Sequence, residues 1–235
     1  MIVKRLLIFI LIIIGLIVLY RCLYESFPQT DNTDTYTFVR PTKTGGCAFE
    51  MYILQHYNTY IKGSGRDHKK TCAGVDNPII IIREPYDRFI SSYKYWKNGA
   101  YQSSQPRTIQ WKKYNNHVTI DDYIEMVKNK DKRLVFQATW EAHYAPQTYW
   151  IKPEDYKKTI VLVYSKHNME KKVFDLLKKL YIKNKYIPFD KINVSYGDDI
   201  SLTPQQMKKI RELYEDDFIL WDKLQNNKSL FRNVI

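Results

Sequence analysis

The sequence predicts an α/β domain in which a parallel sheet is flanked by helices. Two short runs of consecutive apolar residues, 79–82 and 160–164, are typical of strands that are buried on both faces of such a sheet. Each run is followed by apolar residues at helical spacing, and strands that alternate with helices indicate a layered α/β architecture. The length of 235 residues suits one domain with a full hydrophobic core.

The first predicted unit is a strand, a glycine loop and a helix. A strand is expected at 36–39, and the turn-rich segment 40–46 follows it. Apolar residues then recur at helical spacing. They are Phe49, Tyr52, Ile53, Tyr57 and Tyr60.

Two further strand–helix units follow. The 79–82 run ends at Arg83-Glu84-Pro85, and a helix is expected from about Tyr86. Its apolar face carries Phe89, Ile90, Tyr93 and Trp96. The 160–164 run precedes a helix with its apolar face on Val173, Leu176, Leu177 and Leu180.

A last helix is predicted near the C-terminus. Thr203 and Gln206 form a T-x-x-Q capping box, and Pro204 takes the first helical position. One helix is expected to continue from there, with Met207, Ile210, Tyr214, Phe218 and Trp221 on its apolar face. The polar and aromatic stretch 100–116 is expected to be a surface loop.

The N-terminus predicts a membrane anchor. Lys4 and Arg5 precede an apolar run at 6–20, which as a helix spans about 22 Å at ~1.5 Å per residue. This is short of a ~30 Å hydrocarbon core, but flanking apolar residues extend it. A cleaved signal peptide is the alternative, although no small-x-small cleavage site follows the run. We expect a cytoplasmic tip and signal-anchor at 1–25, a stem at 26–34 and the folded domain at 35–235, with the domain on the far side of the membrane.

Charge and cysteine content narrow the functional classes. The formal net charge of +12, with a pI of about 9.4, favours anionic partners but does not choose among nucleotides, nucleic acid, acidic polysaccharides and membrane surfaces. Three cysteines, Cys22, Cys47 and Cys72, are too few for a disulfide framework and match no zinc pattern. Free thiols are favoured over a Cys47–Cys72 bridge.

The segment Pro41-Thr42-Lys43-Thr44-Gly45-Gly46-Cys47 is the first group of candidate site residues. Free N–H groups at a helix start, reached closely because of the glycines, make an anion site. Thr44 adds a hydroxyl, and Lys43 adds a charge that can neutralise a leaving phosphate. A Walker A loop has its lysine after the last glycine, so this is not a standard ATP or GTP loop.

The second group is Arg83-x-Pro85-x-x-Arg88-x-x-Ser91-x-Tyr93, directly after the 79–82 strand. Ligands of α/β sheets collect at the carboxyl ends of the strands, and the planar fork of arginine bonds two phosphate oxygens. The alternative is that Arg83 and Arg88 are ordinary surface charges that pair with Glu84 or Asp87.

Together these two groups resemble the PAPS-dependent sulfotransferase family, where PAPS is 3′-phosphoadenosine 5′-phosphosulfate. The match is closest to the Golgi type that acts on carbohydrates, including heparan and chondroitin sulfotransferases. The resemblance covers about 35–224. Three weaker segments agree, and they are His143-Tyr144-Ala145-Pro146-Gln147, Asn193-Val194-Ser195 and Tyr214-Glu215-Asp216-Asp217-Phe218. The chain departs from the pattern at Cys47-Ala48, where family members usually have Thr or Ser.

The resemblance implies a P-loop-like sulfotransferase fold and a role for each group. The first loop would bind the 5′-phosphosulfate through Lys43 and its neighbours, and Arg83 with Ser91 would bind the 3′-phosphate. His68 is the candidate general base because related enzymes often carry a histidine between the two motifs, and Glu50 is the other candidate. Glu50 and His143 are also candidates for binding the acceptor in its cleft. His56 is expected in the core, and His117 and His167 at the surface.

The predicted function is sulfonyl transfer from PAPS to a hydroxyl without a metal. The acceptor is expected to be a glycan, which can itself be anionic, and no nucleic-acid partner is expected. A type II membrane protein of the Golgi or secretory-pathway lumen follows from the anchor and the resemblance. The rival functions are a nucleotide-dependent kinase or other phosphotransferase on a similar fold, and a non-catalytic glycan-binding protein on the same scaffold.

Overall fold

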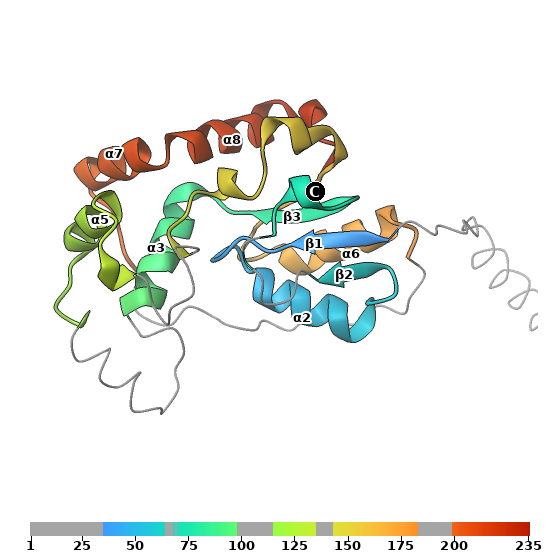
Figure 1. The fold of residues 1–235 in the computed structure, drawn as a ribbon, viewed down its shortest axis with the longest axis horizontal. Helices are drawn as coiled ribbons and strands as arrows, with labels where there is room; N and C mark the ends of the chain where they lie inside the picture. The colour runs from blue at the N-terminus through green and yellow to red at the C-terminus, as the bar shows by residue number, and fades with distance from the viewer. Residues whose placement is uncertain (1–34, 64–67, 69, 98–114, 135–142, 183–198) are drawn as a thin grey trace, which may run out of the picture.

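A computed structural model describes residues 35–63, 68, 70–97, 115–134, 143–182 and 199–235. Its centre is a five-stranded sheet in the order β2-β1-β3-β4-β5 (Figure 1). Every neighbouring pair in this sheet is parallel. Helices cover the sheet, so the predicted α/β architecture is confirmed.

The strands are short, and β3 is at the centre. Their bounds are β1 Tyr36–Val39, β2 Ile61–Gly63, β3 Pro78–Ile82, β4 Ile160–Val163 and β5 Asn233–Val234. Phe38 of β1 pairs with Ile79 of β3, and Ile80 of β3 pairs with Val161 of β4. The isoleucines of β3 are all 0% exposed, as expected for a strand with helices on both faces.

The described helices are α2 Gly46–His56, α3 Pro85–Lys97, α5 Ile120–Lys128, α6 Met169–Lys179, α7 Pro204–Leu213 and α8 Glu215–Asn226. Short 3₁₀ turns lie at Cys72–Gly74, Lys132–Leu134, Gln147–Tyr149, Pro153–Lys158 and Lys228–Leu230. The helices predicted after the strands at 36–39, 79–82 and 160–164 are therefore confirmed as α2, α3 and α6. The first ends at His56, so Tyr60 lies beyond it and is 37% exposed.

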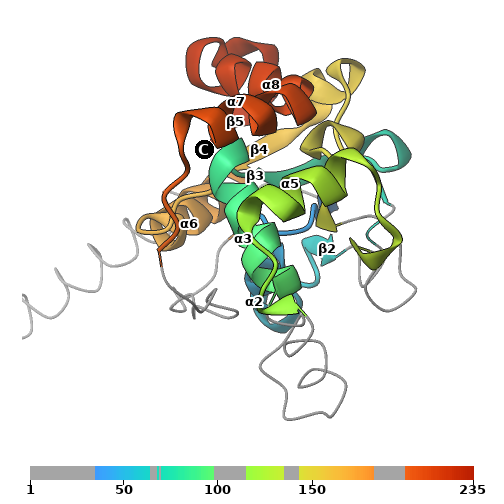
Figure 2. The ribbon, with the colours of Figure 1, turned by 90° about the vertical axis from the view of Figure 1, so that its left-hand side faces the viewer.

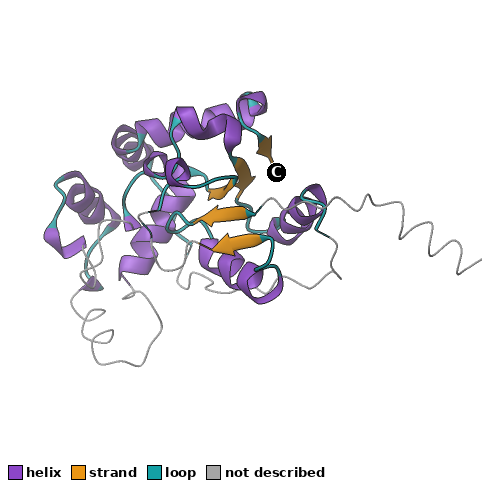
Figure 3. Cartoon of the chain, turned by 45° about the vertical axis from the view of Figure 1, so that its right-hand side comes forward, coloured by secondary structure: helices purple, strands orange, loops and turns teal. Residues whose placement is uncertain are grey.

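Among the described helices, α2 and α6 cover one face of the sheet and α8 covers the other. Phe49 of α2 and Leu176 of α6 pack in one core cluster with residues of β1, β3 and β4. On the opposite face, Leu220 and Leu224 of α8 pack against alternate residues of the same strands, such as Ile80. Figure 3 shows α-helices on both sides of the strands. This sandwich buries both faces of the sheet and fixes the positions of the strand ends.

A third core cluster joins α3 to α5, α7 and α8. Phe89 of α3, Tyr123 of α5 and Tyr214 at the α7–α8 junction lie in it. Figure 2 shows α3 and α5 next to each other, with α7 and α8 beyond them. Because α3 follows β3 directly, this cluster fixes the helix that carries the second group of candidate residues.

The C-terminal region is two helices, so the prediction of one continuous helix is wrong. The Thr203 capping box is present, but α7 stops before Tyr214, whose φ of −126° is not helical. The Tyr214 hydroxyl donates to the carbonyl oxygen of Tyr144 at 2.7 Å, and α8 begins at the next residue. The bend lets Tyr214 and Asp217 both reach the segment around Tyr144. Met207, predicted on the apolar face, is 37% exposed.

Three elements were not predicted from the sequence. The strands β2 and β5 are edge strands of three and two residues, too short for a periodicity signal. Helix α5 begins with a capping box between Thr119 and Asp122, which is its sequence signal. The predicted anchor and stem at 1–34, and most of the predicted loop at 100–116, lie outside the described residues. Within the part of the chain that is described, no helix is both long and apolar enough to cross a membrane.

Candidate active site

The strand order places the two predicted groups next to each other. The chain leaves β1 for β2 on one side and then returns past β1 to β3. The order therefore reverses between β1 and β3, and ligands of open α/β sheets bind at such a point, outside the carboxyl ends of the strands. The loop with Lys43 follows β1, and Arg83 follows β3. Arg83 Nη1 donates to the carbonyl oxygen of Lys43 at 3.1 Å.

The loop after β1 has a fixed and unusual backbone. Lys43 has a φ of +62° and Gly45 a φ of +81°. A Cβ on Gly45 would lie 2.8 Å from Cε2 of Tyr164, so this position requires glycine for both conformation and space. The Thr44 hydroxyl, predicted as a donor to phosphate, donates within the loop to the carbonyl oxygen of Pro41 at 3.0 Å. The loop is therefore held by its own contacts.

The start of α2 has the features of an anion-binding site. Gly45 is the N-cap residue, and it makes no side-chain cap hydrogen bond. The first N–H groups of a helix have no intrahelical acceptor, and they carry the positive end of the helix dipole. Gly46 and Cys47 are the first two residues of this helix. A phosphate or sulfonate group fits these donors, with Lys43 beside them.

Lys43 is held in a site that disfavours its positive charge. Burial, and to a lesser extent the positive charge of Arg83, lowers the pKa of Lys43 to about 7. Its Nζ lies 3.9 Å from the centre of the Tyr95 ring. An anionic ligand at the start of α2 would restore the protonated form, because an opposite charge within a few ångströms favours ionisation.

Arg83 is half-buried and forms an ion pair. Its Nε and Nη2 donate to the two carboxylate oxygens of Asp87 at 2.7 and 2.8 Å, and its guanidinium lies 4.5 Å from the Tyr164 ring centre. The pairing with Asp87 agrees with the alternative that the sequence left open. The Asp87 side chain is 50% exposed, so a phosphate can compete with it for the same two donors.

Arg88 is buried, so the alternative prediction that it is an ordinary surface charge is wrong. It is 3% exposed, and burial lowers its pKa. Its Nε donates to the carbonyl oxygen of Thr42 at 3.1 Å, and its Nη2 donates to that of Ala145 at 2.7 Å. Arg88 thus ties the Lys43 loop to the H-x-x-P-Q segment. Ser91, one turn later on α3, is also buried, at 3% exposed.

Arg40 links the two candidate bases. Its Nη1 donates to Glu50 Oε2 at 2.6 Å, and its Nη2 lies 3.1 Å from His68 Nε2. Because a guanidinium only donates, Nε2 of His68 must accept, and a proton on this neutral ring then sits on Nδ1. Arg40 Nε is buried and has no hydrogen-bond partner among the described residues.

The positions of Glu50 and His68 are firmly set. Glu50 is 4% exposed, and a Cβ on Gly63 would lie 2.7 Å from its Oε1, so β2 approaches it closely. Trp150, which is fully buried, donates its indole N–H to the backbone carbonyl oxygen of His68 at 2.7 Å. The candidate base predicted from sequence therefore lies beside the Lys43 loop.

His143 completes the cluster. Its ring stacks on Tyr95 with 4.7 Å between centres and 14° between planes, and it lies 6.2 Å from the His68 ring. Ser92 donates to the backbone carbonyl oxygen of His143 at 2.5 Å. Burial, together with the positive charge of Lys43, lowers the pKa of His143 to about 3. Its imidazole is therefore neutral at physiological pH.

The H-x-x-P-Q segment is held by the Y-x-x-D-F segment. Asp217 accepts hydrogen bonds from the backbone N–H groups of Gln147 at 2.8 Å and Thr148 at 3.0 Å, and it lies 3.9 Å from Arg88. Gln147 in turn accepts from the N–H of Arg83 and donates to its carbonyl oxygen, both at 2.9 Å. Two weak sequence signals are thus partners in one structural unit that supports Arg83.

The remaining histidines and Cys72 are outside this cluster, whereas Cys47 Sγ accepts from Arg40 Nη1 at 3.9 Å. His117 and His167 are exposed, as predicted, whereas His56 is half-buried at the end of α2. Cys47 and Cys72 are both free. Burial raises the pKa of Cys72 to about 12. No group of three or more His, Cys, Asp or Glu residues that could hold a metal occurs in the described ranges. The Asn193-Val194-Ser195 segment lies outside them.

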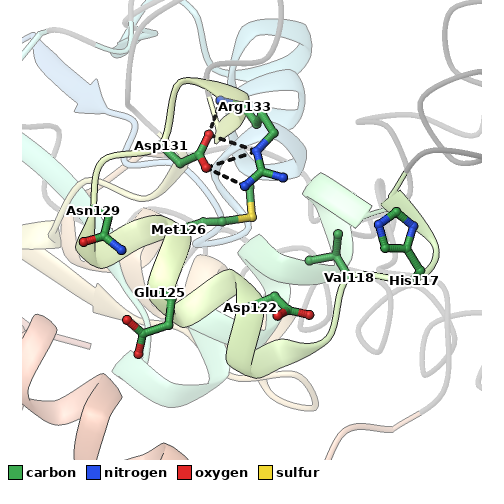
Figure 4. Close-up of a pocket in the computed structure, with 8 residues that line it drawn as sticks. All are labelled: His117, Val118, Asp122, Glu125, Met126, Asn129, Asp131 and Arg133. Carbon is green, nitrogen blue, oxygen red and sulfur yellow. Dashed lines mark hydrogen bonds and ion pairs between the residues drawn. The ribbon is translucent and has the colours of Figure 1, made fainter.

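A separate pocket of about 340 Å³ lies along α5 (Figure 4). Most of its lining residues are polar, and they include the Asp131–Arg133 ion pair at 2.6 Å. Its lining residues are His117, Val118, Asp122, Glu125, Met126, Asn129, Asp131 and Arg133. None of them belongs to the predicted site.

Arg40, Tyr95 and Ser92 were missed by the sequence analysis. Arg40 is the first residue of the turn-rich segment 40–46, and Tyr95 lies one helical turn after Ser91, so each had a positional signal. Their roles depend on contacts across 28 and 52 residues, from Arg40 to His68 and from Lys43 to Tyr95, which local spacing does not reveal.

A protein-family model for the sulfotransferase family matches residues 51–223. The match includes Arg83, Ser91 and His143, and it begins after the Lys43 loop. Comparisons with curated proteins and with solved structures found no significant match. The family match covers most of the chain, and the five-stranded parallel sheet flanked by helices fits the sulfotransferase fold. The chain therefore belongs to the sulfotransferase family and is a sulfotransferase enzyme.

Proposed function

We propose that the protein transfers a sulfonyl group from PAPS to a hydroxyl of a carbohydrate. The observation that carries this proposal is the contact between the two motifs: Arg83 donates to the Lys43 carbonyl oxygen at the reversal point of the sheet. A donor with one anionic group at each end of a nucleotide needs two cationic sites on the same edge. A 5′-phosphosulfate suits the α2 start, and a 3′-phosphate suits Arg83.

The residues present fit such a donor. Pro41, Thr42, Thr44, Gly45 and Gly46 shape the loop, and the uncapped start of α2 supplies N–H donors. PAPS would supply the sulfonyl group, and PAP, the desulfonated nucleotide, would leave with the electron pair of the broken S–O bond on its 5′-phosphate. Lys43, with its charge beside the α2 start, would neutralise the oxygen that takes the electron pair of the broken S–O bond. Cys47 brings no hydroxyl, so backbone donors would carry that contact.

Arg83 and Ser91 have different tasks under this proposal. Arg83 would exchange its bidentate pair with the exposed Asp87 for a bidentate pair with the 3′-phosphate. Ser91 is buried on the following helix, so its hydroxyl would reach the phosphate only from within the protein. Arg83 is therefore the main determinant of 3′-phosphate recognition.

We propose His68 as the general base that takes the acceptor hydroxyl proton. A pKa near 3 makes His143 too weak a base, and His68 is the other imidazole of the cluster, 6.2 Å from the His143 ring. His68 Nε2 accepts from Arg40 in the ligand-free site, so the acceptor hydroxyl would replace Arg40 there. His143 would then orient the acceptor. Glu50 is the alternative base, and it forms an ion pair with Arg40 at 2.6 Å.

The base is tested by pH–rate profiles of the full-length wild type, His68→Ala and Glu50→Gln. We expect His68→Ala to lose about 10²–10⁴-fold in kcat and to lose the acidic limb, because general base catalysis contributes that much. Glu50→Gln should keep the limb. A His68→Ala enzyme with normal rate and limb, together with a Glu50→Gln enzyme that lacks both, would assign the base to Glu50.

A carbohydrate acceptor is supported by the family resemblance and by the charge. A net charge of +12 favours an acceptor that is itself anionic, such as an acidic polysaccharide. We do not propose a nucleic-acid partner.

We also propose a type II membrane protein with its domain in the Golgi or another secretory-pathway lumen. This location is supported by the proposed carbohydrate acceptor and by the apolar run at 6–20. Protease protection in sealed microsomes tests this, and a soluble form beginning near residue 22 would contradict it.

The transferase activity is tested with labelled PAPS and a panel of glycans. The wild type should give a sulfated glycan, and Lys43→Ala should lower kcat by about 10²–10³-fold, as for other charge-stabilising groups. Lys128→Ala removes an exposed lysine at the end of α5 and is the matched control. Near-normal turnover of Lys43→Ala would remove Lys43 from the mechanism.

A further inference from the structure

Tyr95 contacts both sides of the proposed reaction. It lies in the last turn of α3 and is half-buried. The Lys43 ammonium lies 3.9 Å from its ring centre, and the His143 ring is stacked on it at 4.7 Å. Lys43 belongs to the donor loop, and His143 belongs to the segment assigned above to the acceptor. One aromatic ring therefore joins residues that lie 100 positions apart in the chain.

The Tyr95 ring is a favourable partner of the Lys43 charge, which burial and two arginines oppose. The face of an aromatic ring is negative and attracts an ammonium group, most strongly where water is excluded. The other titratable groups that act on Lys43 are Arg83, Arg88 and Cys47, and Lys43 in turn acts on His143. Cys47 favours the protonated form of Lys43, whereas both arginines oppose it. Without the ring, the ammonium form of Lys43 would be less stable beside Arg83 and Arg88.

The same ring fixes the plane of His143. Ser92 holds the backbone of His143, but the stacking contact with Tyr95 orients the imidazole itself. An imidazole that stays neutral can stack closely without the cost of burying a second charge near Lys43. The direction of the His143 ring and the position of the Lys43 ammonium are thus set by one side chain.

We propose that Tyr95 is a positioning residue for sulfonyl transfer. Its ring favours the ammonium form of Lys43 and fixes the position of that ammonium, and it orients His143 for the acceptor. The hydroxyl of Tyr95 is not needed for either task. This inference rests on the proposed function, because it assigns Tyr95 a role through Lys43 and His143.

The matched variants are Tyr95→Phe, which keeps the ring, and Tyr95→Leu, which removes it. In the full-length enzyme we expect Tyr95→Phe to stay within about twofold of wild type in kcat. Tyr95→Leu should lower kcat about tenfold or more with a smaller change in the KM for PAPS. The basic limb of its pH–rate profile should move to lower pH by roughly 0.5–1 unit, because loss of the ring lowers the pKa of Lys43.

A second readout needs no activity. Lysine labelled with ¹³C at the ε position reports the titration of Lys43 by NMR in the ligand-free protein, with Lys43→Arg to assign the signal. The titration midpoint should fall in Tyr95→Leu and stay in Tyr95→Phe. If Tyr95→Leu does not fold, Tyr95→Met also lacks the ring and takes its place.

The outcomes separate this inference from the proposed function. An unchanged Lys43 midpoint and an unchanged basic limb in the ringless variant would overturn the role of Tyr95, even if transfer is confirmed. A shifted midpoint in a protein that transfers no sulfonyl group would leave the Lys43–Tyr95 interaction standing and would reject the proposed function. Equal loss of rate in Tyr95→Phe and Tyr95→Leu would assign the effect to the hydroxyl and also overturn the inference.

Discussion

Lys43 is the residue whose protonation state most affects the site. Burial and Arg83 lower its pKa to about 7, so it is protonated below this pH and neutral above it in the free enzyme. A bound 5′-phosphate favours the protonated form and raises the pKa of Lys43 again. Binding of an anion above pH 7 must therefore be accompanied by uptake of a proton.

We predict that the affinity for PAP, the desulfonated product, falls as the pH rises above 7. The fall should approach tenfold per pH unit, because one proton is taken up for each ligand bound. Lys43→Arg keeps its charge throughout this range, so its affinity should change little between pH 7 and 9. Isothermal titration calorimetry in buffers of different ionisation enthalpy measures both affinity and proton uptake. Equal slopes for the two proteins would contradict this account of Lys43.

Single residues differ in how far the sequence reveals them. Lys43 and Arg83 were predicted because each follows a strand in a recognisable motif. Arg40 was not, because its two partners lie 10 and 28 residues away and meet it only once β2 is in place. The burial of Arg88 was not predicted either, because a charged residue is read as exposed unless its acceptors are known, and here they are two backbone carbonyl oxygens.

The loop between β1 and α2 depends on one glycine in particular. Gly45 has a φ of +81°, and a Cβ there would overlap the Tyr164 ring. Gly74 has open space around its Cβ position and makes a matched control. Both are glycines in short connecting segments of the described chain. They differ in whether the local structure has room for a side chain.

We predict that Gly45→Ala destabilises the protein by about 1–3 kcal/mol, from the left-handed conformation and the overlap. It should also weaken PAP binding, because the start of α2 must shift. Gly74→Ala should change the free energy of unfolding by less than about 1 kcal/mol. Urea denaturation with calorimetry on the same samples measures both effects. Similar stability of the two variants would mean that the loop adapts freely.

A contact between secondary-structure elements joins α8 to the H-x-x-P-Q segment. Asp217 is 1% exposed and accepts from two backbone N–H groups beside the buried Arg88. Its neighbour Asp216 is exposed. Removal of one partner of a buried charge pair leaves the other charge uncompensated, so the two aspartates should differ greatly in their effect on stability.

We predict that Asp217→Ala costs about 3–5 kcal/mol of stability, whereas Asp216→Ala is within about 0.5 kcal/mol of wild type. Differential scanning calorimetry of the two variants gives the comparison. A small effect of Asp217→Ala would show that Arg88 finds other partners, and the H-x-x-P-Q segment would then not depend on α8.

Strands and helices were predicted correctly where their sequence pattern is local and extends over enough residues to show a periodicity. The strands β1, β3 and β4 and the helices after them follow from apolar runs and helical spacing. The break between α7 and α8 did not follow, since the apolar spacing continues through Tyr214. That break comes from tertiary contacts of Tyr214 with Tyr144, and of Asp217 with Gln147 and Thr148.

The whole molecule is organised so that one edge of its sheet collects the charged groups. The order β2-β1-β3-β4-β5 brings the ends of β1 and β3 together, and α3 then carries Arg88, Ser91 and Tyr95 alongside. Strand order was not predicted from the sequence, because nothing local states which strands are neighbours. The α/β class was enough to expect the motifs at the strand ends, and the order shows why the two motifs meet.

The central claim is that the Lys43 loop and Arg83 form one site for a nucleotide with a 3′-phosphate. Isothermal titration calorimetry with PAP and ADP tests it directly on the wild type, Arg83→Ala and Arg133→Ala, the last being an exposed arginine in an ion pair. Wild type and Arg133→Ala should bind PAP about 10- to 100-fold more tightly than ADP, since charge-assisted hydrogen bonds contribute about 1.5–3 kcal/mol each. Arg83→Ala should lose most of this preference. Equal affinity of the wild type for PAP and ADP would contradict the claim.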